Sequence, residues 1–190
     1  MATTLDDIAS FLDARGMKYE RRSETSIQTG YNGLSRYRNP GGDNLLRLVI
    51  QIAEEGRYFM VAAPEAYIVP VENAGPFLQA CAMIQWRTKL IQFEYDANDG
   101  EVRAVIEFPL EEAPLTEGQL MRCVTGMTQL LEDYHVVLAR ARDEGVVRFE
   151  QDEERTVEML SQLLSGYPPE LLAEALQRAH GRQGGPEAEA

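Results

Sequence analysis

Residues 84–102 read IQWRTKLIQFEYDANDGEV, and this stretch determines the predicted fold class of the chain. Its first residues end an amphipathic helix that we place at residues 76–89. Apolar and polar residues then alternate along residues 91–95, as they do in a strand with one buried face. The sequence Asn98-Asp99-Gly100 favours a tight turn, after which the alternation resumes up to residue 109. A helix that leads directly into a two-stranded antiparallel ribbon predicts an α+β fold.

One further helix is predicted on each side of this stretch. Thr4 is a typical N-cap residue, and Gly16 is a typical stop for the short helix that Thr4 opens. Thr116, with Gln119 three residues later, forms a capping box that opens the longest helix, at residues 116–144. Because one face of this long helix is apolar, we expect it to pack on the sheet. That face consists of Leu120, Val124, Met127, Leu131, Tyr134 and Leu138.

Two pairs of strands are predicted between the first and second helices. Residues 27–31 and 34–38 alternate weakly and flank Asn32-Gly33, a dipeptide that favours a hairpin turn. Residues 46–52 and 58–63 alternate more regularly, and we expect this pair at the centre of the sheet. The predicted architecture is an antiparallel sheet of about five strands with helices packed on it, in the order α-β-β-β-β-α-β-β-α.

The 190 residues are enough for one domain and an appendage. We place the domain at residues 4–145 and a C-terminal helical extension at residues 146–180. The extension begins with a charged connector at residues 148–155 and contains two short amphipathic helices. These two helices are predicted at residues 157–164 and 170–180. Residues 181–190 have the composition of a disordered tail.

With 44% hydrophobic and 26% charged residues, the chain has the composition of a soluble globular protein. No apolar run approaches the roughly 20 residues of a membrane span, and residues 1–7 show no secretory signal. Cys81 and Cys123 lack the spacing of metal ligands, so a reducing cytoplasm is the expected location. The net charge of −13 disfavours nucleic acid and membrane as partners.

Positive charge is concentrated in one part of this acidic chain. Residues 15–47 contain seven basic and three acidic side chains, whereas the sequence beyond them is strongly acidic. One interpretation is that the basic residues lie on the solvent-facing side of an antiparallel sheet. The other is that Arg36, Arg38 and Arg47 form a docking patch for an acidic peptide or protein. The sequence leaves both interpretations open.

Residue types that carry catalysis are sparse. The two histidines, His135 and His180, have no companion at a useful spacing, and we expect both to be structural. Cys81 and Cys123 lie within predicted helices, which favours buried, inert thiols. The glycines at residues 39–42 lack the Lys-Ser/Thr pair that follows them in a phosphate-binding loop. We therefore predict no catalytic residue, no metal site and no cofactor.

The helix at residues 76–89 is apolar on two sides. At about 100° per residue, two groups of apolar side chains lie nearly opposite each other. The first group is Phe77, Cys81 and Ile84, and the second is Met83, Trp86 and Leu90. Because the protein's own sheet covers one face only, the second group needs another partner. We predict that it contacts either a second chain or the C-terminal extension of its own chain.

The order of elements and several local motifs resemble the YbjN family, whose domain has the type III secretion chaperone-like fold. The resemblance covers roughly residues 4–143 and is most specific in its second half. Its motifs are VIQIAEEGR at 49–57, WR at 86–87 with KL at 89–90, FEY at 93–95, DGEVR at 99–103, PLE at 109–111, APLT at 113–116 and QL at 119–120. The C-terminal extension departs from the minimal family pattern.

This resemblance implies a protein-binding role without catalytic residues. Members of the family are described as regulators in sensory or stress pathways, and secretion chaperones act as homodimers that bind extended segments of partner proteins. Our leading prediction is therefore a non-enzymatic, homodimeric protein-binding module of chaperone-like or regulatory type. Two alternatives stay open. One is a small-molecule-binding protein or enzyme with a pocket between the ribbon and the long helix, and the other is a structural accessory subunit of a larger complex.

Overall fold

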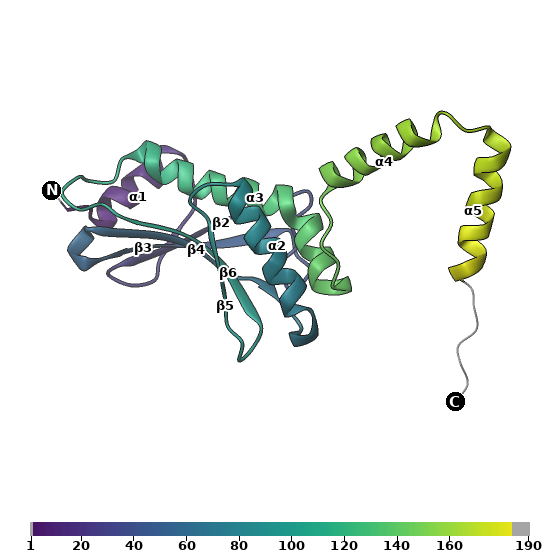
Figure 1. Ribbon diagram of the computed structural model, residues 1–190. Helices are drawn as coiled ribbons and strands as arrows, with labels where there is room; N and C mark the ends of the chain where they lie inside the picture. The colour runs from purple at the N-terminus through teal and green to yellow at the C-terminus, as the bar shows by residue number, and fades with distance from the viewer. Residues whose placement is uncertain (1, 184–190) are drawn as a thin grey trace. The chain divides into compact units, whose positions relative to one another are not determined.

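The computed structural model describes residues 2–183. The chain divides into two compact units, Met1–Val147 and Arg148–Ala190. The strands and helices α1 to α3 belong to the first unit, and helices α4 and α5 belong to the second. Figure 1 shows these helices along the chain. Within the described residues, each helix is too short or too polar to cross a bilayer.

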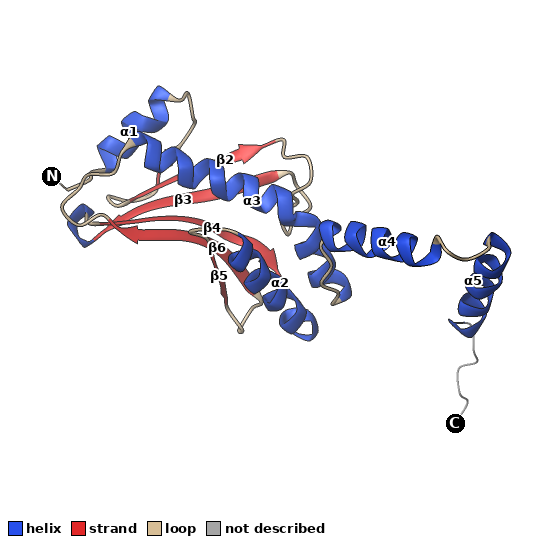
Figure 2. Ribbon diagram, turned by 45° about the horizontal axis from the view of Figure 1, so that its top comes forward, coloured by secondary structure: helices blue, strands red, loops and turns tan. Residues whose placement is uncertain are grey.

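The first unit is built on a six-stranded antiparallel sheet in the order β1-β2-β3-β4-β6-β5 (Figure 2). The strands are β1 (Glu20–Arg21), β2 (Ser26–Asn32), β3 (Leu45–Ala53), β4 (Tyr58–Ile68), β5 (Gln92–Tyr95) and β6 (Glu101–Pro109). The two central positions belong to β3 and β4, as predicted. The α+β class and the predicted order of elements are confirmed, with six strands where about five were expected.

Three helices lie on the same face of the sheet (Figure 1). They are α1 (Leu5–Ala14), α2 (Ala74–Arg87) and α3 (Glu117–Glu144). Alternate residues of β3, from Leu46 to Ile52, are buried, whereas the residues between them are exposed or half-buried. The apolar face predicted for α3 is buried too, except that Tyr134 is half-buried. The hydrophobic core therefore lies between the sheet and these helices, and the opposite face of the sheet is open within this unit.

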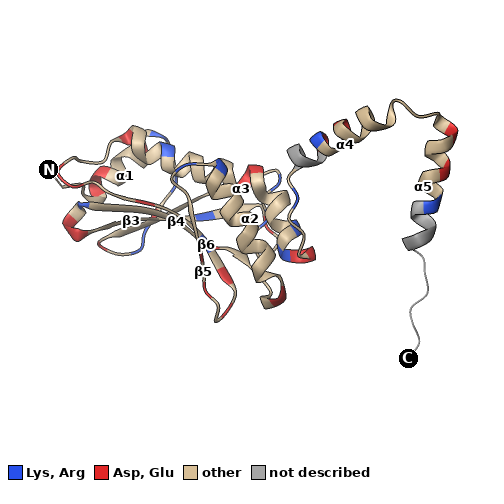
Figure 3. Cartoon of the chain, in the orientation of Figure 1, with Lys and Arg blue, Asp and Glu red and all other residues tan. Residues whose placement is uncertain are grey.

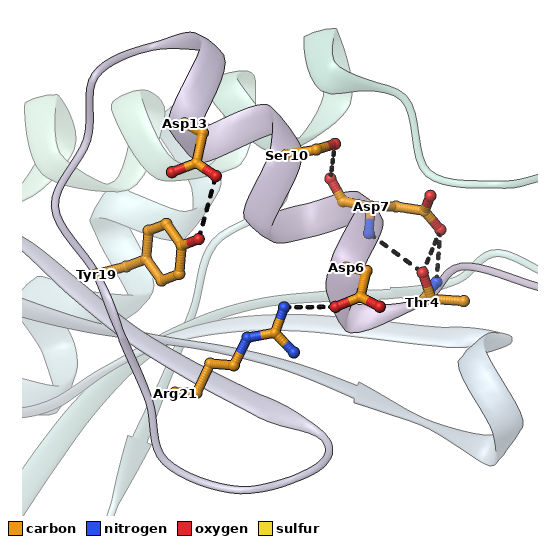
Figure 4. Close-up of polar contacts among 7 residues, drawn as sticks. All are labelled: Thr4, Asp6, Asp7, Ser10, Asp13, Tyr19 and Arg21. Carbon is orange, nitrogen blue, oxygen red and sulfur yellow. Dashed lines mark hydrogen bonds and ion pairs between the residues drawn. The ribbon is translucent and has the colours of Figure 1, made fainter.

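Both predicted helix starts are confirmed. The hydroxyl of Thr4 accepts a hydrogen bond from the backbone N–H of Asp7 at 3.2 Å, and the Asp7 carboxylate accepts one from the backbone N–H of Thr4 at 2.8 Å (Figure 4). Thr116 opens α3 with the same type of capping box. Figure 4 also shows Arg21 of β1 paired with Asp6 of α1. This ion pair links the first helix to the short edge strand.

The hairpin predicted around Asn32-Gly33 is wrong. Residues 34–38 form a loop, while β2 pairs with β3 along its whole length and with the short β1. The side chain of Tyr37 in this loop is buried, and the carboxylate of Glu132 accepts its backbone N–H. Burial of a large aromatic side chain outweighs the turn preference of the dipeptide, because tertiary packing overrides a local propensity.

The second unit consists of α4 (Glu150–Leu164) and α5 (Pro169–Gln183). The charged connector predicted at residues 148–155 is wrong, because α4 begins at Glu150. Acidic residues suit the first turns of a helix, where the helix dipole is positive, so their abundance is compatible with helix. Most apolar side chains of the unit, such as Val157, are exposed. Of the tail predicted at 181–190, residues 184–190 lie outside the described residues.

Candidate protein interface on the second helix

The inner face of α2 anchors the helix to the first unit. Phe77, Cys81 and Ile84 are buried on this face, as predicted, and α2 packs beside α3. At the C-terminal end, the backbone N–H and the hydroxyl of Thr88 both donate to the carbonyl oxygen of Ile84, at 3.0 and 2.8 Å. Burial of the inner face fixes the rotation of α2 and leaves its opposite side pointing away from the core, while the Thr88 bonds close the helix end.

The outer face of α2 is apolar and uncharged. It consists of Leu78, Ala82 and Trp86, which follow one another at four-residue intervals on one side of the helix. Leu78 is 37% exposed and Trp86 is 91% exposed. No residue from Asn73 to Trp86 carries a charge, although 26% of the whole chain is charged. An exposed helix face is where soluble proteins normally place charged side chains, so this composition is typical of the centre of a protein interface.

The three residues predicted for the interface lie in different settings. Trp86 belongs to the outer face of α2, Met83 is half-buried, and Leu90 follows the helix end with 56% of its surface exposed. Leu90 also has a φ angle of +71°. This left-handed conformation costs an L-residue about 1–2 kcal/mol. Leu90 lies in the turn between the end of α2 and buried Ile91, and its role in an interface stays a prediction.

Two arginines of the predicted acidic-partner patch are engaged with oxygen atoms of their own chain. Nη1 of Arg38 donates to two carbonyl oxygens of its own loop, at 3.2 and 2.6 Å. Nη1 of Arg47 lies 3.4 Å from Oε2 of Glu65. Arg36 is exposed. Figure 3 shows basic positions interspersed with acidic ones over this unit. An acidic partner would have to displace these contacts, and its capture by the three arginines stays a prediction.

Glu132 of α3 holds the loop that carries two of these arginines. Its Oε1 accepts the backbone N–H groups of Ser35 and Arg36, at 2.7 and 2.8 Å, and its Oε2 accepts that of Tyr37 at 2.9 Å. Partial burial raises the pKa of Glu132, but the three hydrogen bonds outweigh burial and leave the pKa below its usual value. Sequence reasoning missed Glu132, because the partners are 95 to 97 residues apart and no local pattern connects them.

A buried aromatic cluster adjoins this loop. The hydroxyl of Tyr37 donates to the carbonyl oxygen of Ala66 at 2.9 Å, and the hydroxyl of Tyr67 lies 3.1 Å from Nδ1 of His135. Burial, and then nearby arginine side chains, lower the pKa of His135. The imidazole is therefore neutral at neutral pH, and it packs against both tyrosine rings. These contacts agree with the structural role expected for His135.

The cysteines are not activated nucleophiles. Burial raises the pKa of Cys81 to about 12 and that of Cys123 to about 11. Both thiols are therefore protonated at neutral pH, and a thiol is a much weaker nucleophile than a thiolate. In the part of the chain that the structure describes, no group of three or more His, Cys, Asp or Glu side chains is placed to hold a metal ion.

No family model and no curated protein matches this sequence. Among solved structures, the chain is similar to YbjN from E. coli, a candidate transcription regulator. The two sequences are 12% identical, the match covers 74% of this chain and 92% of that chain, and the TM-score is 0.54. This likeness shows a shared fold, which confirms the resemblance predicted from the sequence.

Two complexes also match. The heterodimeric ExoU–SpcU complex from the type III secretion system of Pseudomonas aeruginosa has 15% identity, coverage of 72% of this chain and 98% of that chain, and a TM-score of 0.44. The ExsC–ExsE complex has 14% identity, coverage of 70% and 95%, and a TM-score of 0.43.

Proposed function

We propose that the chain is a non-enzymatic protein-binding module, which pairs with a second copy through the outer face of α2 and binds a partner protein as a homodimer. The observation that carries this proposal is the uncharged outer face, on which Trp86 is 91% exposed. Tryptophan is among the residues that most often dominate the binding energy of protein interfaces. Leu78, Ala82 and Trp86 carry no charge, although Arg87 directly follows Trp86, so another protein that covers this face displaces little polar solvation.

The spacing of residues along α2 suits a symmetric pair. Leu78 and Trp86 lie four residues on either side of Ala82, which is about 6 Å along the helix axis in each direction. When two copies of α2 pack antiparallel about a twofold axis at Ala82, Trp86 of each copy meets Leu78 of the other. The small side chain of Ala82 lets the helix axes approach to about 8–10 Å. The outer face is therefore complementary to itself.

Sedimentation equilibrium of the full chain tests this pairing. We expect a dimer at micromolar concentration, and Trp86→Ala should weaken it by about 2–4 kcal/mol, or roughly 30- to 1000-fold in affinity. Leu45→Ala is the matched control, because Leu45 is 41% exposed but lies on β3, and this variant should dimerise normally. A wild-type chain that is monomeric at about 100 µM, or an unchanged dissociation constant for Trp86→Ala, would refute the pairing.

A second variant separates binding from folding. Leu90→Gly removes an exposed side chain and also relieves the positive φ angle, since glycine adopts it freely. We expect the thermal stability of the monomer to stay unchanged or rise, while self-association or partner capture weakens. If Leu90→Gly lowers stability and leaves association intact, Leu90 serves the fold and does not belong to the interface.

A further inference from the structure

Adjoining hollows lie at one end of the sheet in the first unit. Three open hollows of about 280, 480 and 360 Å³ share their walls there. Ile68 lines the first and the third, while Tyr95 and Ala97 line the second and the third. The backbone N–H of Glu65, in the wall of the first hollow, donates to Oε1 of Glu101, in the wall of the second, at 2.9 Å. The three hollows together form the end groove.

The fold builds the end groove where the sheet is interrupted. The pairing of β4 with β6 shifts register between Ala63 and Tyr67, and Glu65 within the shift has a φ angle of +48°. Such a bulge bends its strand and changes the direction of the neighbouring side chains. Regular pairing resumes at Tyr67 with Val102 and continues to Ile68 with Glu101, beside the turn between β5 and β6. The groove is therefore made by the loop before β3, the end of β4 and the β5–β6 turn.

Half of the exposed large apolar side chains in the described part of the first unit line this groove. The six side chains are Leu45, Ile68, Val71, Leu78, Trp86 and Leu90. The last three belong to α2 or directly follow it. The first three line the end groove, where Leu45 is 41% exposed, Ile68 40% and Val71 80%. The groove is thus a second apolar surface, formed by other residues than the outer face of α2.

The rim of the end groove is acidic. Its ionisable side chains comprise six acids and two bases. The acids are Asp43, Glu65, Glu94, Asp96, Asp99 and Glu101. The two bases, Arg47 and Arg103, are ion-paired with Glu65 and Glu94 of the same rim. The lining of the end groove therefore combines three exposed apolar side chains with a surplus of negative charge.

We infer that the end groove binds a basic amphipathic segment of another protein. The apolar residues of this segment lie on Leu45, Ile68 and Val71, and its Lys or Arg side chains face the acidic rim, because complementary charge favours the encounter and fixes the register. The exposed amphipathic helix α4 of a second copy is excluded as the occupant by its own charge, five acidic residues against one basic. This inference goes beyond the proposed homodimer, since it concerns a different surface.

The test uses the full chain and a fluorescein-labelled peptide of leucine and lysine, about 18 residues long, with leucines at helical spacing. A matched peptide carries glutamate in place of every lysine. We expect fluorescence anisotropy to show binding of the lysine peptide alone. Binding should weaken between roughly 0.1 M and 1 M salt, because the screening length falls from about 10 Å to about 3 Å. No binding of the lysine peptide, or equal binding of both peptides, overturns the inference.

Variants locate the peptide on the protein. Val71→Ser and Ile68→Ser should each weaken binding about tenfold, since each removes apolar area from the contact. Val71 is 80% exposed, so this substitution leaves the fold intact, which circular dichroism verifies. Trp86→Ser is the matched control and should bind the peptide like the wild type, whatever happens to the dimer. The inference is overturned if Val71→Ser and Ile68→Ser bind the peptide like the wild type, or if Trp86→Ser alone loses peptide binding. Either result leaves the proposed pairing through α2 to be tested by sedimentation.

Discussion

The contact between Glu132 and the loop at residues 34–38 gives a quantitative prediction. Glu132→Ala removes the acceptor of three backbone N–H groups, those of Ser35, Arg36 and Tyr37. A hydrogen bond to a charged group contributes about 1.5–3 kcal/mol when it is shielded from water. We assign this contribution to the hydrogen bond from the part-buried N–H of Tyr37. Water replaces the carboxylate at the two exposed N–H groups, so each adds only about 0.5 kcal/mol.

The expected loss for Glu132→Ala is therefore about 2.5–4 kcal/mol, or roughly 5–16 °C in melting temperature for a chain of this size. Glu132→Gln should be nearly as harmful. Its one carbonyl oxygen still serves Ser35 and Arg36, but its NH₂ group then faces the N–H of Tyr37, and two donors cannot bond. Asp133→Ala, an exposed carboxylate one position along α3, is the matched control and should change stability by less than about 0.5 kcal/mol.

The pH dependence follows from the lowered pKa of Glu132. The stabilisation by the Glu132 carboxylate is fully present when the pH is above about 4.5, the pKa of this carboxyl in the unfolded chain. It is lost as the pH falls through the lower pKa that Glu132 has in the folded chain. Urea unfolding followed by far-ultraviolet circular dichroism measures it, from pH 7 down to about pH 3. The reasoning is refuted if Glu132→Ala matches Asp133→Ala at pH 7, or if the gap between wild type and Glu132→Ala is constant over the acid range.

Four further predictions concern other parts of the first unit. Gly100→Ala should lower the free energy of unfolding in urea by about 2–4 kcal/mol, because position 100 has a φ of +78° and a Cβ there would lie 2.4 Å from a backbone carbonyl oxygen. Gly118→Ala is the control and should leave the free energy of unfolding unchanged, because open space surrounds position 118. Tyr67→Phe should lower the free energy of unfolding by about 1 kcal/mol, because it removes the hydroxyl that lies 3.1 Å from Nδ1 of His135. Because folding favours neutral His135, the stability advantage of wild type over His135→Gln should shrink as the pH falls below about 6.5, and an advantage that grows would contradict this assignment. Cys81 should react with iodoacetamide only when the protein unfolds, as timed alkylation with mass spectrometry will show, and rapid native labelling would contradict its burial.

Local interactions explain the parts of the fold that the sequence predicts well. The capping boxes at Thr4 and Thr116 are each completed within three residues, so both partners are visible in a short window of sequence. The central strands β3 and β4 have one buried face, and burial of one face imposes alternation. Helical periodicity also placed Trp86 opposite the buried face of α2, where the structure exposes it, but it did not identify Leu78 and Ala82, and the interface role of Trp86 stays a prediction.

Contacts between distant segments explain what the sequence did not reveal. The loop at residues 34–38 is not a strand because Tyr37 is buried and Glu132 binds its backbone from almost 100 residues away. The end groove joins the surroundings of Leu45, Ile68 and Tyr95, which become neighbours only through the order of strands in the sheet. Charge density at the start of α4 suggested a loop, although acidic residues there are compatible with a helix N-terminus.

Trp86 has an optical consequence as well. It is the single tryptophan of the chain, and 91% of it is exposed. Its indole already lies in water in the monomer, so the fluorescence of the monomer will change little on unfolding. A molecule that covers the outer face of α2 will shift the emission to shorter wavelength and shield the ring from a dissolved quencher such as iodide. Intrinsic fluorescence, which commonly follows folding, will in this protein work as a label-free assay for the pairing of two copies through the outer face of α2.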